Sequence, residues 1–199
     1  MTKITVLGGS GFLGSHLCDL LFQKKFQVII YDKKKSKYLN KNQKFIEGDI
    51  LDKNRLFKAI KGADYVFNFA GAANMDDLKY DPMKTVKSNI QGTVNALEAS
   101  SKFKIKKFIH ASTIYANTEE GGFYGRSKKA AEDYVEEFKK KFNLNYTILR
   151  FGSIFGPRAG VDNGVRQILE NLIKKRKLIY KGTRNSIRRY IYVKDAAKL

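Results

Sequence analysis

The clearest reactive pair in this sequence is a tyrosine and a lysine in the stretch FYGRSKKAAEDYVEEF, positions 123–138. Tyr124 and Lys128 stand four positions apart, so they share one face if the stretch is helical. A nearby ammonium group, together with the positive ring of an oxidised cofactor bound beside it, stabilises a phenolate and lowers the tyrosine pKa from about 10. A tyrosine ionised in this way can accept a proton from a substrate hydroxyl at neutral pH. The pair therefore predicts a general base, Tyr124, assisted by the positive charge of Lys128.

The same helical face continues as an apolar stripe. Steps of three and four residues lead from Lys128 to Ala131, Val135, Phe138 and Phe142. A stripe of this kind faces a core. Lys128 is therefore expected at the buried end of the stripe, and Lys129 on the solvated surface.

A glycine-rich segment, GGSGFLG at positions 8–14, follows a predicted strand and opens a predicted helix. It satisfies G-x-G-x-x-G with Gly9, Gly11 and Gly14, and G-x-x-G-x-x-G with Gly8, Gly11 and Gly14. Glycine at such positions permits a tight turn and close approach of the backbone to a pyrophosphate. The helix N-terminus adds free N–H groups and a partial positive charge. The segment predicts a phosphate-binding loop of the dinucleotide type.

An acidic residue, Asp32, ends the second predicted strand 18 residues after Gly14. A carboxylate there binds the adenosine ribose hydroxyls and repels a 2′-phosphate. NAD is therefore the expected cofactor in preference to NADP, although the lysines at positions 33–35 weaken this preference.

Short apolar runs alternate with helical patterns through the first three quarters of the chain. Helices are predicted at 11–25, 52–62 (with Asp52 as N-cap), 82–102 and 122–143, and strands at 3–8, 26–32, 44–49, 63–71, 106–113 and 145–152. This alternation indicates an α/β fold with a doubly wound parallel sheet of the Rossmann type. The alternation then loosens into a turn at 156–158, a helix at 162–175 and a short strand at 178–182. We therefore divide the chain into a Rossmann domain, residues 1–152, and a partial substrate-binding region, residues 153–199.

Ligands bind outside the carboxyl ends of the strands in open α/β sheets. The strand at 106–113 should therefore bring Ser112 or Thr113 close to Tyr124 and Lys128. A hydroxyl at this place would orient the same substrate oxygen from which Tyr124 takes a proton.

The composition narrows the classes of function. The net charge is +20, but the lysine runs are scattered and show no basic motif interleaved with aromatic residues. We interpret them as solvated faces whose field favours anionic ligands, with no nucleic-acid partner. No apolar run approaches the roughly 18 residues of a membrane span, and no secretory signal pattern opens the chain. The single cysteine, Cys18, fits a cytoplasmic protein.

Metal chemistry is not indicated by the sequence. No Cys/His/Asp cluster has the spacing of metal ligands. His16, in a predicted helix, and His110, in a predicted strand, are interpreted as packing residues.

Motifs along nearly the whole chain resemble those of extended short-chain dehydrogenases/reductases, specifically the nucleotide-sugar epimerase/dehydratase family. The matching segments include GGSGFLG, SNIQGTVNALEAS (88–100), FIHAST (108–113), Tyr124-x-x-x-Lys128, ILRFGSIFGPR (148–158) and RRYIYVKDAAKL (188–199). The resemblance implies bound NAD, a nucleotide-diphosphate sugar as substrate, and Tyr124 as base with Lys128 holding the nicotinamide ribose. Thr113 would be the hydroxyl partner, with Ser112 beside it.

The resemblance also implies further contacts. The residues expected to contact the cofactor are Gly8, Gly9, Gly11, Phe12, Leu13, Gly14, Asp32, Asp49, Ile50, Ala70 and Lys128. Those expected to contact the substrate are Ser153, Arg158 and Arg189, with Arg189 gripping the diphosphate. Helices 82–102 and 122–143 resemble those that pair in homodimers of the family, so a homodimer is expected.

Three departures from the family pattern bear on the reaction. Thr113 is followed by Ile114 and Tyr115 rather than the Asp-Glu pair of dehydratases, which argues against dehydration. The connection from Thr113 to Tyr124 is shorter than usual, and Ser153 replaces a substrate-contacting asparagine. Family members also continue beyond the position of Leu199, so the substrate domain is expected to be truncated here.

These observations predict an epimerase resembling UDP-glucose 4-epimerase, which oxidises and re-reduces one ring carbon. A reductase or dehydrogenase with net hydride transfer is an alternative. A dinucleotide-binding module without catalysis is another.

Overall fold

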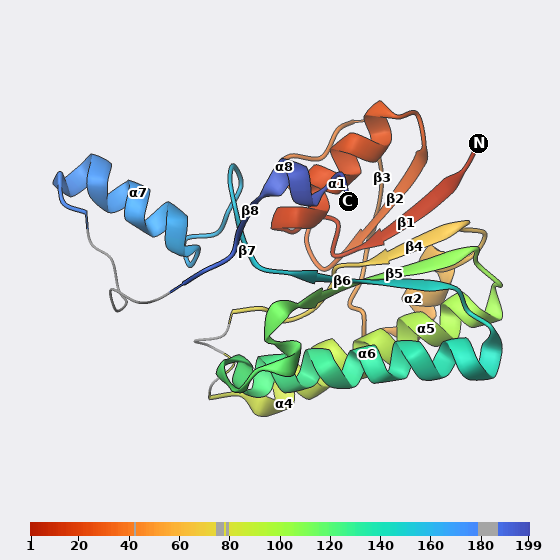
Figure 1. The fold of residues 1–199 in the computed structure, drawn as a ribbon. Coiled ribbons are helices and arrows are strands. Elements are labelled where there is room, and N and C mark those ends of the chain that lie inside the picture. The colour runs from red at the N-terminus through yellow and green to blue at the C-terminus, as the bar shows by residue number, and fades with distance from the viewer. Residues whose placement is uncertain (42, 75–77, 79, 179–186) are drawn as a thin grey trace.

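The computed structural model describes residues 1–41, 43–74, 78, 80–178 and 187–199 (Figure 1). Its centre is one six-stranded sheet in the order β3-β2-β1-β4-β5-β6, in which every pairing is parallel. The strands are β1 Lys3–Leu7, β2 Gln27–Asp32, β3 Lys44–Glu47, β4 Tyr65–Asn68, β5 Lys107–Thr113 and β6 Tyr146–Phe151. The predicted doubly wound Rossmann sheet is confirmed, and its strand order reverses between β1 and β4.

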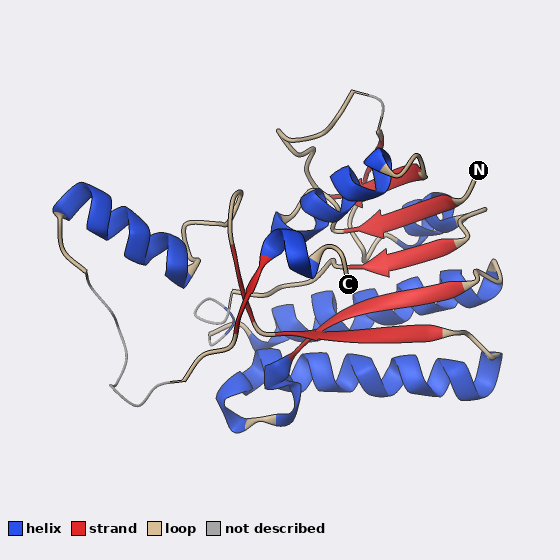
Figure 2. Ribbon diagram, turned by 45° about the horizontal axis from the view of Figure 1, so that its top comes forward, coloured by secondary structure: helices blue, strands red, loops and turns tan. Residues whose placement is uncertain are grey.

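Helices cover both faces of the sheet (Figures 1 and 2). One face packs on α1, Phe12–Gln23, through a core that includes Val6, Leu17 and Ile30. The opposite face packs on α2 Lys53–Ile60, α5 Gly92–Lys102 and α6 Gly122–Phe142. The Asp52 carboxylate caps α2 by accepting a hydrogen bond from the Arg55 N–H, as predicted. Both faces of the sheet are therefore buried, as near-continuous apolar strands require.

The helix expected at 82–102 contains an irregular turn. It begins as α4, Pro82–Thr85, passes through a π-helical segment η1, Val86–Gln91, and continues as α5. Such widened turns are frequent at functional sites. The π-helical turn carries the fully buried Asn89, so a polar side chain faces the interior here.

The apolar stripe of α6 is confirmed only in part. Lys128 is 6% exposed, and Ala131 and Val135 are fully buried beneath the helix. The prediction for Phe142 is wrong, since this residue is 62% exposed at the last turn and contacts only the tilted ring of Phe138 among its aromatic neighbours. A straight helix drifts about 20° per seven residues against a fixed seven-residue pattern, so the stripe has rotated off the core by the end of α6.

The chain after β6 forms a smaller unit. Strands β7 Ser153–Phe155 and β8 Tyr190–Tyr192 pair in parallel. Between them α7, Gly164–Lys175, projects from the body, while α8, Val193–Ala196, packs against α1 (Figure 1). Most of the strand predicted at 178–182 lies outside the described residues. Within the described part of the chain, no helix is long and apolar enough to cross a membrane.

Candidate active site

The glycine-rich segment forms a tight turn between β1 and α1. Gly8 has a left-handed backbone with φ of 77°, and a Cβ added there would lie 2.6 Å from the backbone nitrogen of Ala70. A Cβ on Gly14 would overlap the carbonyl oxygen of Gly8. At Gly9 an added Cβ would lie 3.0 Å from the Cys18 sulfur, so this glycine allows the loop to pack closely against α1. The cradle exists because these positions carry no side chain.

Two adjoining cavities lie beside this turn, at the carboxyl ends of the strands. The larger, about 320 Å³, is lined by Asp32 and Ile50 on the β2–β3 side. The smaller, about 190 Å³, is lined by Phe12 and Leu13 of α1 and by the residues of the reactive end. Both share Gly8, Gly11, Phe69, Ala70, Gly71 and Ala72. Together they form one cleft across the point where the strand order reverses, which is the usual ligand position in such sheets.

Asp32 anchors the larger cavity to the glycine loop. Its Oδ2 accepts a hydrogen bond of 3.0 Å from the Ser10 N–H. Behind it, the Tyr31 hydroxyl donates to the Asp49 carbonyl oxygen at 2.7 Å, and burial raises the pKa of Tyr31 to about 12. Tyr31 therefore stays a neutral hydrogen-bond donor that holds the loop after β3 against the cavity.

Asp49 itself does not line the cavity. Its carboxylate forms an ion pair of 2.7 Å with Lys33 and accepts the Leu51 N–H. Burial acts to raise the pKa of Asp49, but the Lys33 ammonium and the Leu51 N–H hold it below its ordinary value. Of the predicted adjacent pair, Ile50 reaches the cavity wall and Asp49 engages Lys33 beside it.

The smaller cavity brings together the predicted reactive residues: Ser112 and Thr113 from β5, and Tyr124 and Lys128 from α6. The short connection between them consists of two single 3₁₀ turns, η2 Ile114–Asn117 and η3 Glu119–Gly121. These four side chains therefore converge, although they come from two elements on opposite sides of the connection.

Burial governs the pKa values in the smaller cavity of the protein without cofactor. Burial raises the pKa of Tyr124, while the Thr113 hydroxyl acts in the opposite direction. Burial lowers the pKa of Lys128 to about 8, and the Glu132 carboxylate opposes this effect. The predicted lowering of the Tyr124 pKa requires the positive nicotinamide ring as well as Lys128, so it stays a prediction for the protein with bound cofactor.

Both histidines are buried, as predicted for packing residues. His16 Nε2 lies 2.9 Å from the Pro157 carbonyl oxygen. His110 stacks on Phe108, and its Nδ1 lies 3.4 Å from Asn68 Nδ2. Burial, followed by the charge of Lys128, holds the pKa of His110 well below its ordinary value, so this imidazole is neutral.

Asn89 is a site residue that the sequence interpretation missed. Its Oδ1 accepts the Ala72 N–H at 2.8 Å, and its Nδ2 donates to the Ala72 carbonyl oxygen at 3.0 Å and to Ser127 Oγ at 2.9 Å. It thus joins the loop after β4 to α6, one residue before Lys128. An asparagine interrupting an amphipathic helix is the signal that could have identified it. The cavity wall also includes Phe151, Gly152 and Ile154, which were not predicted.

The predicted substrate contacts have different positions. Arg189 is exposed, and its carbonyl oxygen accepts the Ser153 N–H at 2.8 Å, beside the cleft residue Gly152. Gly152 and Ile154 line the cleft, but Ser153, which lies between them in the chain, does not.

Arg158 is not brought to the cleft. Its Nη2 donates to Asp19 on α1 at 2.7 Å, and its guanidinium lies 4.4 Å from the Tyr38 ring centre. The structure therefore gives no support to the predicted substrate contact of Arg158. The tight turn at 156–159, where Arg158 has φ of 69°, directs its side chain toward α1.

The described residues contain no group of three or more His, Cys, Asp or Glu side chains that could hold a metal ion.

The fold and the cleft define the class of protein: a doubly wound α/β protein with a dinucleotide-type phosphate loop beside a Tyr-x-x-x-Lys pair. The model of the NAD dependent epimerase/dehydratase family matches residues 4–199, and the chain belongs to this family.

Individual relatives are similar over almost the whole chain. A protein from Methanocaldococcus jannaschii provisionally named UDP-glucose 4-epimerase is 29% identical over 98% of this chain and 71% of its own length. The solved UDP-glucose 4-epimerase of Thermotoga maritima with UDP-glucose is 32% identical, with a TM-score of 0.90 over 99% of this chain and 71% of that one. The Thermus thermophilus UDP-glucose 4-epimerase in complex with NAD is 28% identical, with a TM-score of 0.87 over 99% of this chain and 72% of that one.

Proposed function

We propose that this chain forms the cofactor-binding part of an NAD-dependent epimerase acting on a nucleotide-diphosphate sugar. The observation that carries the proposal is the convergence of Thr113, Tyr124 and Lys128 in one cavity beside the glycine turn. We assign residues 1–152 to NAD binding and residues 153–199 to part of the substrate-binding region. Similarity to UDP-glucose 4-epimerases supports a UDP-sugar as the substrate class.

The residues of the cleft fit NAD. A Cβ at Gly8 or Gly14 would fill the cradle that a pyrophosphate needs, and the first turn of α1 supplies N–H groups. The Asp32 carboxylate at the other end suits ribose hydroxyls and repels a 2′-phosphate. Lys33, which could attract such a phosphate, is paired with Asp49. Phe12, Leu13, Ile50 and Ala70 provide the apolar walls.

Bound NAD would supply reversible hydride transfer at one ring carbon of the sugar. The chain's own residues handle the proton. The Tyr124 phenolate accepts the proton of the ring hydroxyl on oxidation and returns it to the same oxygen on reduction, while Thr113, with Ser112 beside it, orients that oxygen. Protonated Lys128 holds the nicotinamide ribose and offsets the negative charge of the phenolate. Because these groups are largely buried, their charges interact more strongly than in water.

The structure supports epimerisation over dehydration at one specific place. Ile114 and Tyr115 occupy the positions at which dehydratases carry an acidic pair. The Tyr115 carbonyl oxygen lies against α6, where a Cβ added at Gly125 would approach it to 2.5 Å. This segment therefore serves as packing, and it brings no carboxylate to the cleft.

We also propose a homodimer that forms through the helices at 82–102 and 122–143. Large apolar side chains that are exposed on them include Met83, Val86, Phe123 and Phe142. Sedimentation velocity at several concentrations would test the dimer. A monomer at all concentrations would refute it.

The experiment that tests the function has two steps, both on the whole chain. Isothermal titration calorimetry with NAD measures cofactor binding, and proton NMR then follows UDP-glucose, UDP-galactose and their N-acetyl forms for interconversion. We expect conversion without net formation of NADH, and none in Tyr124→Phe. Tyr134→Phe, an exposed tyrosine on the same helix, is the matched control. Stoichiometric NADH formation would instead indicate a dehydrogenase, and NAD binding without any conversion would contradict the epimerase proposal.

A further inference from the structure

A buried carboxylate lies one helical turn beyond Lys128. Glu132 stands four residues further along α6, and its side chain is fully buried. An isolated buried carboxylate is costly because it loses its hydration. Here two hydrogen bonds from one guanidinium compensate: Arg150 Nε donates to Oε1 at 2.9 Å, and Nη2 donates to Oε2 at 2.6 Å. A two-point bond of this kind fixes both the position and the orientation of the carboxylate.

The ion pair joins α6 to the sheet at the reactive end. Arg150 lies on β6 directly opposite Ser112 of β5, and Thr113 follows Ser112. The Glu132–Arg150 contact therefore sets how deeply α6 sits against the strand end that carries the hydroxyl partners. The Arg150 side chain is 43% exposed, so its own charge remains partly hydrated while Glu132 presents its charge to the interior.

Glu132 is also the charged group that acts on Lys128. Burial favours the neutral amine of Lys128, and the Glu132 carboxylate acts against it. Burial likewise acts to raise the pKa of Glu132, but the hydrogen bonds from Arg150 hold it below its ordinary value, so the carboxylate stays ionised. The elements packed against α6 carry further titratable or charged groups, namely Lys84, Lys87, Glu98, Lys102, Lys107, His110, Tyr115, Glu119, Glu120, Tyr146 and Arg150.

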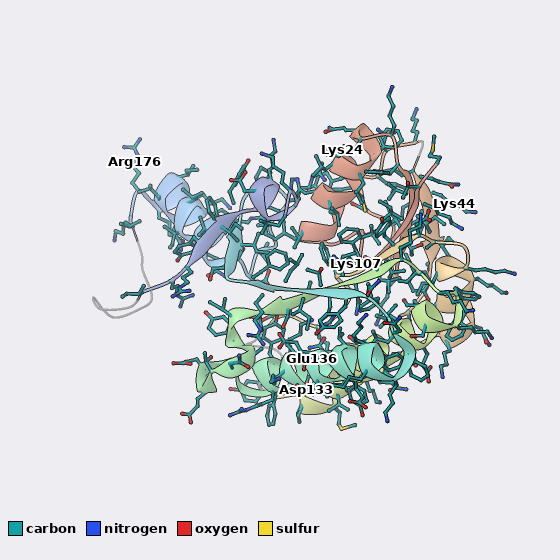
Figure 3. The ribbon with its side chains drawn as sticks, turned by 45° about the vertical axis from the view of Figure 1, so that its right-hand side comes forward. Lys24, Lys44, Lys107, Asp133, Glu136 and Arg176 are labelled. Carbon is teal, nitrogen blue, oxygen red and sulfur yellow. The ribbon has the colours of Figure 1, made fainter. Side chains whose placement is uncertain are left out.

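The outer face of α6 provides a natural comparison. Lys129 and Asp133 form an ion pair with the same four-residue spacing, 2.5 Å between Nζ and Oδ1. Asp133 is 58% exposed on α6 (Figure 3). This pair also joins a lysine to a carboxylate on α6, but both of its side chains are exposed to solvent.

We propose that Glu132, held by Arg150, is a positioning residue whose buried carboxylate serves as the counter-charge of Lys128 one helical turn away. The proposal deepens the function proposed above and rests on it for the use of Lys128. The charge state of Lys128 can nevertheless be measured without NAD or a sugar. A failure of the proposed role of Glu132 can therefore be distinguished from a failure of the proposed function.

The test is an NMR titration of the lysine side-chain amines in the whole chain, with Lys128 assigned by its absence in Lys128→Met. In the unmodified protein Lys128 should titrate near pH 8. In Glu132→Gln, which keeps the shape but removes the charge, the midpoint should fall by about one pH unit, since an opposite charge at close range shifts a pKa by about that much or more. In Asp133→Asn, the matched control, the Lys128 midpoint should not move.

NAD affinity provides a second measurement. At pH 8 Glu132→Gln should bind NAD several-fold more weakly, whereas at pH 6 the two proteins should bind equally, because Lys128 is then protonated in both. A purely structural role of Glu132 would weaken binding equally at both pH values.

An unchanged Lys128 midpoint in a folded Glu132→Gln protein would overturn the proposal. An equal shift in Asp133→Asn would overturn it as well. If Glu132→Gln does not fold, the double variant Glu132→Gln/Arg150→Gln leaves no charge unpaired, and the same fall in midpoint is expected. If the unmodified chain does not bind NAD, the proposed function fails, and the titration still decides the role of Glu132.

Discussion

Replacing Lys128 by methionine should stabilise the fold and weaken cofactor binding at the same time. The side chain of Lys128 is 6% exposed, and burial lowers its pKa from the ordinary 10.5 to about 8. At about 1.36 kcal/mol per pH unit, carrying the charge at pH 7 costs the folded state about 3 kcal/mol. Methionine has a similar length and no charge, so Lys128→Met should raise the free energy of unfolding by most of this amount.

The pH dependence makes this prediction specific. Between pH 8 and 10.5 the unfolded chain holds the lysine proton while the folded chain releases it, so the free energy of unfolding of the unmodified protein rises with pH through this window. The advantage of Lys128→Met should therefore be about 3 kcal/mol at pH 7 and about 1.4 kcal/mol at pH 9.5. Urea denaturation of both proteins at the two pH values measures the difference.

The control is Lys129→Met on the partly exposed neighbour. A surface substitution usually changes the free energy of unfolding by less than about 0.5 kcal/mol, and this variant should show no dependence on pH relative to the parent. Calorimetry with NAD should show at least about tenfold weaker binding for Lys128→Met alone, since a hydrogen bond to a charged group contributes about 1.5–3 kcal/mol. If the two variants have the same stability profiles, the buried, functional position of Lys128 is refuted.

Three further outcomes are expected. Gly14→Ala should lower the free energy of unfolding by about 1–3 kcal/mol in urea titrations and weaken NAD binding, because the new Cβ would overlap the Gly8 carbonyl oxygen. Unchanged stability and affinity would contradict the need for a glycine at this place in the phosphate loop. Asp32→Asn should weaken NAD binding about tenfold in calorimetry and narrow the preference for NAD over NADP, because the ribose loses a charged acceptor; an unchanged ratio of the two affinities would argue against its role. Asp52→Ala should cost about 1 kcal/mol in urea titrations by removing the cap of α2, and a loss below about 0.3 kcal/mol would contradict the capping bond.

The environment of Tyr124 shows what spacing alone omits. Four-residue spacing correctly indicated that Tyr124 and Lys128 share a cavity. The direction of the tyrosine pKa depends instead on how much water the fold removes from the phenol, and burial raises it. In the proposed enzyme the phenolate therefore needs the bound, positively charged cofactor as well as Lys128.

Local sequence patterns were sufficient to predict several other features. The alternation of strands and helices, the glycine turn at 8–14 and the Asp52 cap depend on periodicity and on residues close together in the chain. These features are decided by backbone sterics and hydrogen bonds within a few residues, so the sequence by itself determined them. The same reasoning located Tyr124 and Lys128 on the inner face of α6.

Only the tertiary structure decided the features that join distant segments. The strand order, the bonds of Asn89 to Ala72 and the two-point contact of Glu132 with Arg150 connect residues 15 or more positions apart. Arg158 turned toward Asp19, 139 positions away, instead of toward the cleft. Such contacts depend on which surfaces the folded layers bring together and on how completely they exclude water, and neither quantity is encoded in a local spacing.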